Sequence, residues 1–483
     1  MAENTFDVVV IGAGPVGENV ADRAVQGGLA VAVVESELVG GECSYWACMP
    51  TKALLRDAAA LRAVRDLPGA NAAVTGALDA TAVLARRDAF AAHWHDDGQV
   101  AWLQGAGVTL VRGQGRLASA RTVSVTGPDG DVTVLEARHA VVIATGSSAV
   151  VPPVPGLADA APWTSREAAS AQAVPGRLAV IGGGVVGAEM ATAYAALGAQ
   201  VTVIARDDLL PMVESFASDL VAETLKRQGV ALHLRTEPRR VDRDDDGIVH
   251  LTLADGTTLD VDEVLVATGR KPRTADLGLD RVGLTPGGWL QVDDSLRVVD
   301  ADGTPVAGGR LYAAGDVNRR APLTHQGKYQ ARALGDTIVA RAQGAPVDLA
   351  PWGRHAATAD ERAVPQVIFT DPEVATVGRT VASAEAAGLR VRAVEYDLGA
   401  VAGAALHADG YTGRAGMVVD EDRKVLVGFT VVGPDVAELL HAATIAIAGE
   451  VPIDRLWHAV PAYPTVSEVW LRLLEAYGRD SQA

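Results

Sequence analysis

The chain has 483 residues, 42 Lys and Arg against 60 Asp and Glu, and a formal net charge of −18. At roughly 150 residues per domain, this length predicts about three domains. The acidic balance argues against a nucleic-acid or anionic-membrane surface, and two cysteines cannot crosslink so long a chain. The acidic N-terminus has neither a secretory nor a transit pattern, so we expect a cytoplasmic protein without a membrane partner.

Short apolar runs alternate with helix-length stretches through the first two-thirds of the chain. Such runs are typical of buried parallel strands joined by helices. They lie at residues 8–11, 30–34, 141–144, 178–181, 201–204 and 264–267. We therefore expect an α/β fold with doubly wound, Rossmann-like sheets.

The first of these runs leads into a glycine-rich turn, Gly12-x-Gly14-x-x-Gly17, and the next run is followed by Glu35. Gly12 permits the turn, Gly14 lets the backbone approach a pyrophosphate, and Gly17 lets the helix pack on the strand. Glu35 can accept hydrogen bonds from ribose hydroxyls. Together these features predict a dinucleotide site.

A second fingerprint, Gly182-x-Gly184-x-x-Gly187, follows residues 178–181, and Ala-Thr-Gly occurs at both 144–146 and 267–269. This internal similarity predicts two nucleotide-binding units. The strand after the second fingerprint ends in Ala205-Arg206 instead of an acid. Because Arg206 can pair with a 2′-phosphate, the sequence favours NADPH, with NADH as the alternative.

Cys43 and Cys48 lie five positions apart on a predicted loop that leads into a helix. A disulfide that closes so small a ring is strained and readily reduced, and a helix N-terminus favours the Cys48 thiolate. The alternatives are a metal site and two inert buried thiols. Since further ligands at suitable spacing are lacking, we predict a redox-active pair and no metal site. His93, His95 and Asp97 resemble a metal cluster, but we interpret them as the solvated end of a charged helical stretch.

The pattern changes after about residue 345. Strand-like runs at 391–396 and 424–432 and a helical run at 436–448 predict a separate α+β domain. A proline-rich stretch at 151–156 is a plausible linker. The predicted domains are 1–150, completed by about 285–345, then 151–284, then 346–483.

Taken in this order, the motifs resemble those of the flavoprotein pyridine nucleotide-disulfide oxidoreductases, the family of dihydrolipoamide dehydrogenase, glutathione reductase and mercuric reductase. The resemblance covers essentially the whole chain and includes residues 312–316 and 369–373. It implies an FAD-binding first domain, an NAD(P)-binding second domain and a C-terminal domain that builds a homodimer. The implied enzyme passes hydride from NAD(P)H to flavin and then to the cysteine pair. Each active site would borrow residues from the partner subunit.

The resemblance also implies roles for individual residues. Cys48 would contact the flavin, and Cys43 would exchange with a substrate. Lys52 and Glu189 would form an ion pair beside the flavin and the nicotinamide. Asp316 would hold the ribityl chain, and His325 would lie in the helix that packs against the flavin, where a purely structural role is equally open. The remaining implied cofactor contacts belong to the family's glycine-containing motifs: Gly41, Thr145, Gly146, Gly269 and Gly315.

One departure from the family pattern bears on the electron acceptor. The family's disulfide reductases end in His-Pro-Thr-x-x-Glu, whose histidine is the acid/base for thiol exchange, whereas this chain has Tyr463-Pro-Thr-Val-Ser-Glu468. At pH 7 an ordinary tyrosine of pKa ~10 is ionised in about one molecule in a thousand, while a histidine of pKa ~6.5 is mostly an available base. We therefore expect poor turnover of lipoamide or glutathione disulfide, unless His458 or a substrate group supplies the base.

The expected acceptor is a small molecule: a non-standard disulfide, a quinone or another electrophile. The alternatives are a dihydrolipoamide dehydrogenase-like reductase that uses another base and a flavin-bound redox sensor. The C-terminal tail has no cysteine pair, which weakens the mercuric reductase interpretation. Tyr45 and Trp46, between the cysteines, either narrow the access to Cys43 or belong to the core.

Overall fold

The computed structural model describes residues 4–479, which divide by their internal contacts into two units. The first unit contains residues 4–49, 88–149 and 270–361, and the second contains residues 50–87, 150–269 and 362–479. The chain returns to the first unit at Arg270, where β15 (Arg270–Pro272) pairs with β7 (Ser147–Ala149). The finer division into three domains stays a prediction.

A seven-stranded sheet forms the centre of the first unit, in the order β3-β2-β1-β6-β5-β4 with β16 paired to β6. Its parallel part consists of β1 (Thr5–Ile11), β2 (Val31–Glu35), β3 (Thr109–Arg112), β6 (Val132–Ile143) and β16 (Leu311–Ala313). The expected parallel strands are confirmed. Antiparallel pairing of β6 with β5 (Thr122–Thr126), and of β5 with β4 (Gln114–Leu117), makes the sheet mixed.

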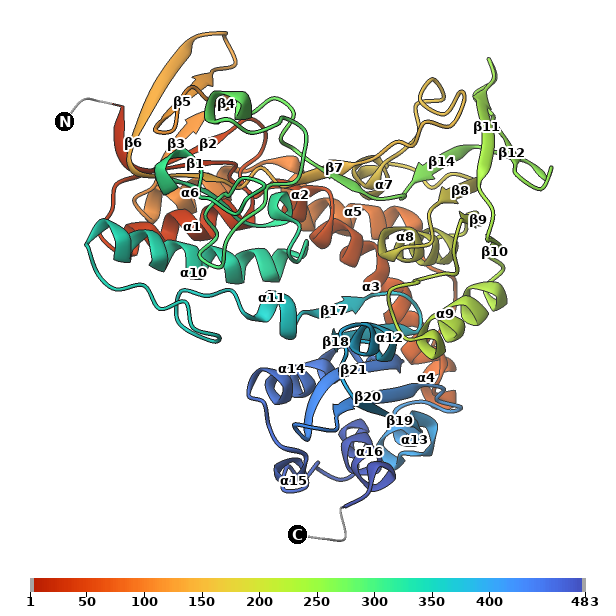
Figure 1. Cartoon of the computed structure of the whole chain (residues 1–483). Helices are drawn as coiled ribbons and strands as arrows, with labels where there is room; N and C mark the ends of the chain where they lie inside the picture. Colours follow the sequence, from red (N-terminus) through yellow and green to blue (C-terminus); the bar gives the residue numbers. More distant parts are fainter. Residues whose placement is uncertain (1–3, 480–483) are drawn as a thin grey trace. The chain divides into compact units, whose positions relative to one another are not determined.

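Both faces of this sheet are buried, as the continuous apolar strands require. Val8 and Val10 of β1 pack in one hydrophobic cluster, while Val9 and Ile11 pack in another. The first cluster includes α1 (Pro15–Gln26) and α10 (Thr324–Ala342), which lie side by side (Figure 1). Since both helices begin beside the carboxyl ends of parallel strands, their first turns lie at the edge where ligands bind in such sheets.

The second unit contains a four-stranded, fully parallel sheet in the order β10-β9-β8-β14. Its strands are β8 (Arg177–Ile181), β9 (Gln200–Ala205), β10 (Ala231–Leu234) and β14 (Glu263–Val266), and α8 (Val185–Ala196) and α9 (Ser215–Arg227) pack in its cluster. A small antiparallel sheet is formed by β11 (Pro238–Arg243), β12 (Val249–Leu253) and β13 (Thr258–Val261). The fingerprint of residues 182–187 lies between β8 and α8, as predicted.

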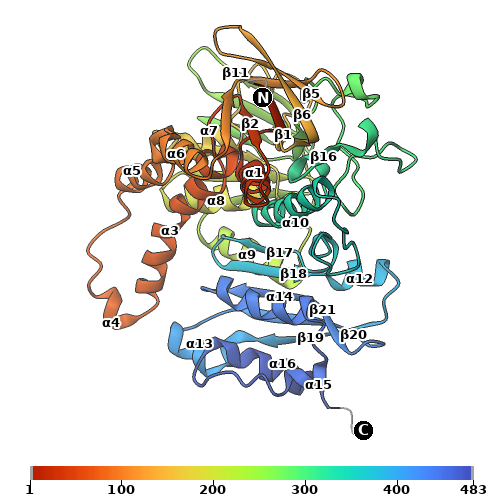
Figure 2. The same cartoon turned by 90° about the vertical axis from the view of Figure 1, so that its left-hand side faces the viewer.

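A five-stranded antiparallel sheet lies in the C-terminal part of the second unit, in the order β17-β18-β21-β20-β19. Its strands are β17 (Pro365–Ile368), β18 (Glu373–Gly378), β19 (Val391–Asp397), β20 (Arg414–Asp420) and β21 (Val425–Gly433). Helix α14 (Leu440–Ala448) packs along β18 and β21, and α16 (Val469–Tyr477) packs along β19 and β20 (Figure 2). The expected α+β segment is therefore present.

His93, His95 and Asp97 are exposed beside the start of α6 (Asp97–Gly105), as the solvated helix-end interpretation expects, although no continuous helix runs through them. Residues Ala92–Trp94 form a 3-10 turn in which His93 has φ 49°, and α6 begins only afterwards. Between this turn and α6, the Asp96 carboxylate accepts hydrogen bonds from the Val39 N–H at 2.7 Å and from Arg112 at 2.5 Å. These contacts join the segment to residues far away in the sequence. Among residues 4–479, no helix is long and apolar enough to cross a membrane.

Candidate active site

The first fingerprint forms the tight turn that its glycines predict. A Cβ on Gly12, which has φ 104°, would collide with the Ala144 carbonyl, and one on Gly17 would collide with the Gly12 carbonyl. At Gly14, in contrast, an added Cβ would meet nothing within 4 Å. Packing therefore requires two of the glycines, while the third faces open space at the N-terminus of α1. This open space beside free helix N–H groups fits a pyrophosphate.

Glu35 lies at the end of β2 and is held against this turn. Its Oε2 accepts from the Ala13 N–H and its Oε1 from the Glu37 N–H, both at 2.7 Å. Burial raises the pKa of Glu35, and the two N–H donors oppose that shift. A carboxylate fixed next to the glycine turn is the group that the ribose of a bound dinucleotide requires.

Two loops far apart in sequence meet in the first unit. Asp316 lies in the 3-10 turn η4 (Asp316–Asn318), directly after Gly315 with φ 80°, and its Oδ2 accepts from Ser147 Oγ at 2.5 Å. Thr145 Oγ1 donates to the Arg273 carbonyl at 2.9 Å. The structure thus brings the first Ala-Thr-Gly segment, including Gly146, to the Asp316 loop. Ser147 was not predicted, although it directly follows that segment.

Both cysteines lie in helices. Cys43 belongs to α2 (Gly41–Tyr45), so the predicted loop is wrong here, whereas Cys48 is the first residue of α3 (Cys48–Arg65), as predicted. Both side chains are half-buried. Thr324 Oγ1, at the start of α10, lies 3.4 Å from Cys48 Sγ, and an added Cβ on Gly41 would lie 3.0 Å from the Gly14 Cα. The first cysteine's helix thus begins against the fingerprint turn.

His325, the second residue of α10, is exposed. Tyr45 belongs to the core: it is 2% exposed and donates from its hydroxyl to the Val39 carbonyl at 3.0 Å. Burial raises the pKa of Tyr45 to about 12. Its ring meets that of Trp46 edge-on, with the centroids 5.7 Å apart. The core alternative therefore holds for Tyr45.

The second fingerprint repeats the geometry of the first. A Cβ on Gly182 would collide with the Ala267 carbonyl and one on Gly187 with the Gly182 carbonyl, whereas one on Gly184 would meet nothing within 4 Å. Gly269, in the second Ala-Thr-Gly segment, has φ 141°. Arg206, directly after β9, is exposed. The open space at Gly184 therefore fits a second pyrophosphate, in the second unit.

The ion pair that the resemblance implies is present in the second unit. Lys52 Nζ lies 2.7 Å from Glu189 Oε2. Glu189 lies in α8 and is only 2% exposed. The other carboxylate oxygen accepts from the Phe369 N–H at 2.9 Å, and the lysine lies 5.2 Å from the Phe369 ring centroid. Phe369 was singled out only as a landmark, because a backbone donor leaves no signal in the sequence.

The candidate residues near the C-terminus differ in their exposure. Tyr463 is 76% exposed, and His458 is exposed as well. Glu468 is 8% exposed, and its Oε2 has no hydrogen-bond partner within residues 4–479. The catalytic roles expected for Tyr463 and Glu468 stay predictions.

Comparisons with known proteins agree with this arrangement. Residues 6–344 match the model of the pyridine nucleotide-disulphide oxidoreductase family, and residues 364–473 match the dimerisation domain of that family. Mercuric reductase of Shigella flexneri is 33% identical over 99% of this chain and 82% of its own length. Dihydrolipoyl dehydrogenase of Chlamydia pneumoniae is 31% identical over 96% of this chain and 95% of its own.

Solved structures show the same fold. LpdA of Mycobacterium tuberculosis has a TM-score of 0.80 and 27% identity, covering 98% of this chain and 99% of its own. The HOCl-induced flavoprotein disulfide reductase RclA of Escherichia coli, solved as a Cu(II) complex, has a TM-score of 0.82 and 23% identity with the same coverage. Family members depend on FAD and use NAD(P)H, which both fingerprints fit. The chain belongs to the pyridine nucleotide-disulfide oxidoreductases and is an FAD-dependent enzyme of that family.

Proposed function

We propose that this oxidoreductase carries two electrons from NAD(P)H, through FAD and the pair Cys43–Cys48, to an acceptor other than lipoamide or glutathione disulfide. The observation that carries the proposal is Tyr463, which stands where the family's disulfide reductases place a histidine base. General-base help is worth ~10²–10⁴ in rate, and an ordinary tyrosine hydroxyl at pH 7 is a poor proton acceptor. Direct reduction of a quinone or another electrophile by the flavin does not require that base, and a specialised small disulfide would supply it from a group of its own.

Bound FAD supplies the chemistry of accepting a hydride and passing its electrons onward. The chain's own residues position the groups. We assign Glu35 to the adenosine ribose and Asp316, held by Ser147, to the ribityl hydroxyls. In the Lys52–Glu189 pair, the buried carboxylate fixes the position of the lysine ammonium group. At the start of α3, the helix N-terminus stabilises the thiolate of Cys48.

The net reaction with a quinone consumes one NAD(P)H, one proton and one quinone and yields NAD(P)⁺ and the hydroquinone. With a small disulfide, the same two electrons and two protons yield two thiols. In that case, Cys43 attacks the substrate and Cys48 resolves the mixed disulfide. Glu468, buried with one oxygen unpartnered in the described residues, could orient a base if one stood at position 463.

The acceptor is tested by steady-state turnover of the holoenzyme with lipoamide, glutathione disulfide and a soluble quinone such as menadione. Wild type should reduce the quinone briskly and both disulfides slowly. For Tyr463→His, we expect the ratio of lipoamide to quinone turnover to rise by roughly 10². Tyr463→Phe separates the loss of the hydroxyl from the gain of an imidazole. Brisk disulfide turnover by wild type would refute the proposal.

We further propose NADPH as the preferred donor, because Arg206 is exposed directly after β9, where an acid would repel the 2′-phosphate. The neighbouring Asp208 is paired with Arg235 at 3.0 Å, which offsets its charge. Arg206→Ala should raise KM for NADPH roughly tenfold and leave KM for NADH unchanged. Arg239→Ala, at an exposed position in β11, is the control, and equal changes for both nucleotides would contradict the assignment.

The family's dimerisation domain and the exposed apolar side chains in its matched region support a homodimer. We also propose that the protein acts in the cytoplasm, because NAD(P)H is available there.

A further inference from the structure

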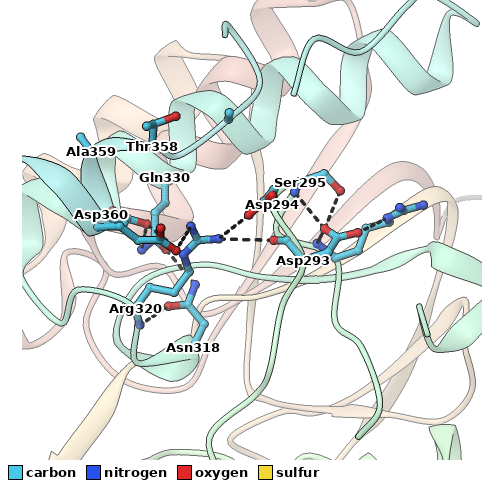
Figure 3. Close-up of polar contacts among 12 residues, drawn as sticks. Asp293, Asp294, Ser295, Asn318, Arg320, Gln330, Thr358, Ala359 and Asp360 are labelled. Carbon is cyan, nitrogen blue, oxygen red and sulfur yellow. Dashed lines mark hydrogen bonds and ion pairs between the residues drawn. The ribbon is translucent and has the colours of Figure 1, made fainter. Parts of the chain in front are cut away.

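A polar network in the first unit joins Asn318, Arg320, Gln330 and Asp360 (Figure 3) and reaches the residue before Asp316. Its centre is Gln330 of α10, which is completely buried. The Oε1 of Gln330 accepts from the Gly315 N–H at 2.8 Å and from Asn318 Nδ2 at 2.9 Å. One side-chain oxygen therefore holds both ends of the four residues 315–318, which include Asp316.

The other end of the Gln330 amide is fixed by a buried carboxylate. Its Nε2 donates to Asp360 Oδ2 at 2.8 Å, and Gln326 Nε2 donates to Asp360 Oδ1 at 3.1 Å. The Asp360 side chain is 0% exposed, and Arg320 Nε lies 3.5 Å from it. Burial raises the pKa of Asp360 to about 6, and Arg320 together with the two amide donors opposes that shift.

The donors and acceptors of this network allow a single orientation of Gln330. Its side-chain amide has one accepting and one donating end, and the Gly315 N–H and Asn318 Nδ2 can only donate. The oxygen must therefore face the loop, and the nitrogen must face a pure acceptor. Asp360 supplies that acceptor. A donor there would favour the reversed amide, which would place NH₂ against the Gly315 N–H.

We propose that Asp360 and Gln330 are positioning residues for FAD, which fix the Gly315–Asn318 loop so that Asp316 meets the cofactor in one geometry. This inference rests on the assignment of Asp316 in the proposed function. It assigns a role to the first turns of α10 and to α11 (Ala359–Arg362), which contribute Gln330 and Asp360, thirty positions apart in sequence. Neither residue is assigned a contact with the cofactor itself.

The test is FAD release from the purified holoprotein, followed as the rise of flavin fluorescence after dilution, without NAD(P)H or an acceptor. Asp360→Asn leaves one side-chain oxygen for the amide donors of Gln326 and Gln330, and its new NH₂ group faces one of these two donors. Gln330→Glu places two buried carboxylates against each other. We expect each variant to release FAD roughly tenfold faster than wild type or more.

The double variant Gln330→Glu/Asp360→Asn again pairs each donor with an acceptor. Between positions 330 and 360, however, the acceptor is now at 330 and the donor at 360. The carboxylate introduced at position 330 accepts from the Gly315 N–H, from Asn318 and from the amide introduced at position 360, whose oxygen accepts from Gln326. The double variant should release FAD within about threefold of wild type. A double variant as impaired as the product of the single effects would overturn the proposal, as would single variants with unchanged release. If Gln330→Glu yields no holoprotein, the double variant must still retain FAD better than Asp360→Asn.

Two further variants separate positioning from general stability and from errors in the proposed function. Asp294→Asn removes an acid that also faces Arg320, at 3.9 Å, but is 78% exposed, and it should release FAD as wild type does. On an Asp316→Ala background, Asp360→Asn should have no additional effect on release. If Asp316→Ala alone leaves release unchanged, the assignment of Asp316 is wrong. If Asp360→Asn retains its full effect on that background, the network does not act through Asp316.

Discussion

At the scale of single residues, the buried acids of the first unit show how burial sets charge. Glu18 lies in the first turn of α1, is 8% exposed, and has an Oε1 without a hydrogen-bond partner in the described residues. Burial raises the pKa of Glu18 from 4.5 to about 7, Lys328 of α10 opposes the shift, and Glu35 adds to it. The folded protein therefore binds a proton at Glu18 that the unfolded chain releases near pH 4.5.

This proton gives the stability a predictable pH dependence. Because the folded pKa is the raised one, wild type loses stability as the pH rises from about 4.5 through about 7, and Glu18→Gln removes that loss. The variant should match wild type near pH 4.5 and exceed it above pH 8, by up to about 3 kcal/mol. Thermal unfolding of the holoprotein at several pH values measures the difference. Asp294→Asn, an exposed control in the same unit, should show no such trend.

At the scale of elements, both units contain the same strand–turn–helix motif. In each motif the first and third glycines are required by close packing, and the second faces open space. Gly17 is needed for the packing of α1 on β1, and Gly14 for the open space in front of the helix. The two requirements have different consequences when a methyl group is added. Gly14 has φ −72° and ψ 178°, a conformation that alanine adopts without strain.

Gly14→Ala and Gly17→Ala form a matched pair that separates binding from folding. Gly14→Ala should keep the unfolding temperature of the FAD-free protein and weaken FAD binding roughly tenfold, since the methyl group occupies cofactor space. Gly17→Ala should lower the stability of the FAD-free protein by about 1–3 kcal/mol or more, because its Cβ collides with a carbonyl. Titration with FAD and thermal unfolding give the two readouts. A loss of stability in Gly14→Ala would contradict the assignment.

At the scale of the whole molecule, four large apolar side chains are exposed in the segment that matches the dimerisation domain. Leu406, Ile445, Val460 and Tyr463 are 69%, 57%, 84% and 76% exposed, respectively. Because this segment matches the family's dimerisation domain, we expect some of these side chains to be covered by the partner subunit. Tyr463 is one of the four, which fits the expectation that each active site borrows residues from the partner subunit.

Val460→Asp tests this surface. We expect the variant to dissociate at protein concentrations where wild type is a dimer, with at least a roughly tenfold weaker association, because a charge would be buried in the interface. Light scattering after size-exclusion chromatography measures the mass. Val132→Asp, at a 62% exposed position in β6 of the first unit, should stay dimeric. A Val460→Asp protein that remains fully dimeric would place the interface elsewhere.

The sequence by itself determined the family and both fingerprints, and it supplied the candidate site residues. Glycine turns, the Cys43–Cys48 spacing and apolar strand runs are local patterns, and local steric and hydrophobic rules act on neighbours in sequence. Cys43 was mispredicted in its local structure, since it lies in α2 and not in a loop. The start of α2 approaches the Gly14 Cα, a contact that the local sequence does not encode.

The tertiary structure alone decided which distant groups meet. The contacts of Ser147 with Asp316, of the Phe369 N–H with Glu189, and of Gln330 with Asp360 join residues that are up to 180 positions apart. Nothing in the local sequence encodes them, because hydrogen-bond complementarity and burial depend on what the folded chain brings together. The exposure of Tyr463 and the burial of Glu468 are likewise set by packing, which the retained sequence motif does not specify.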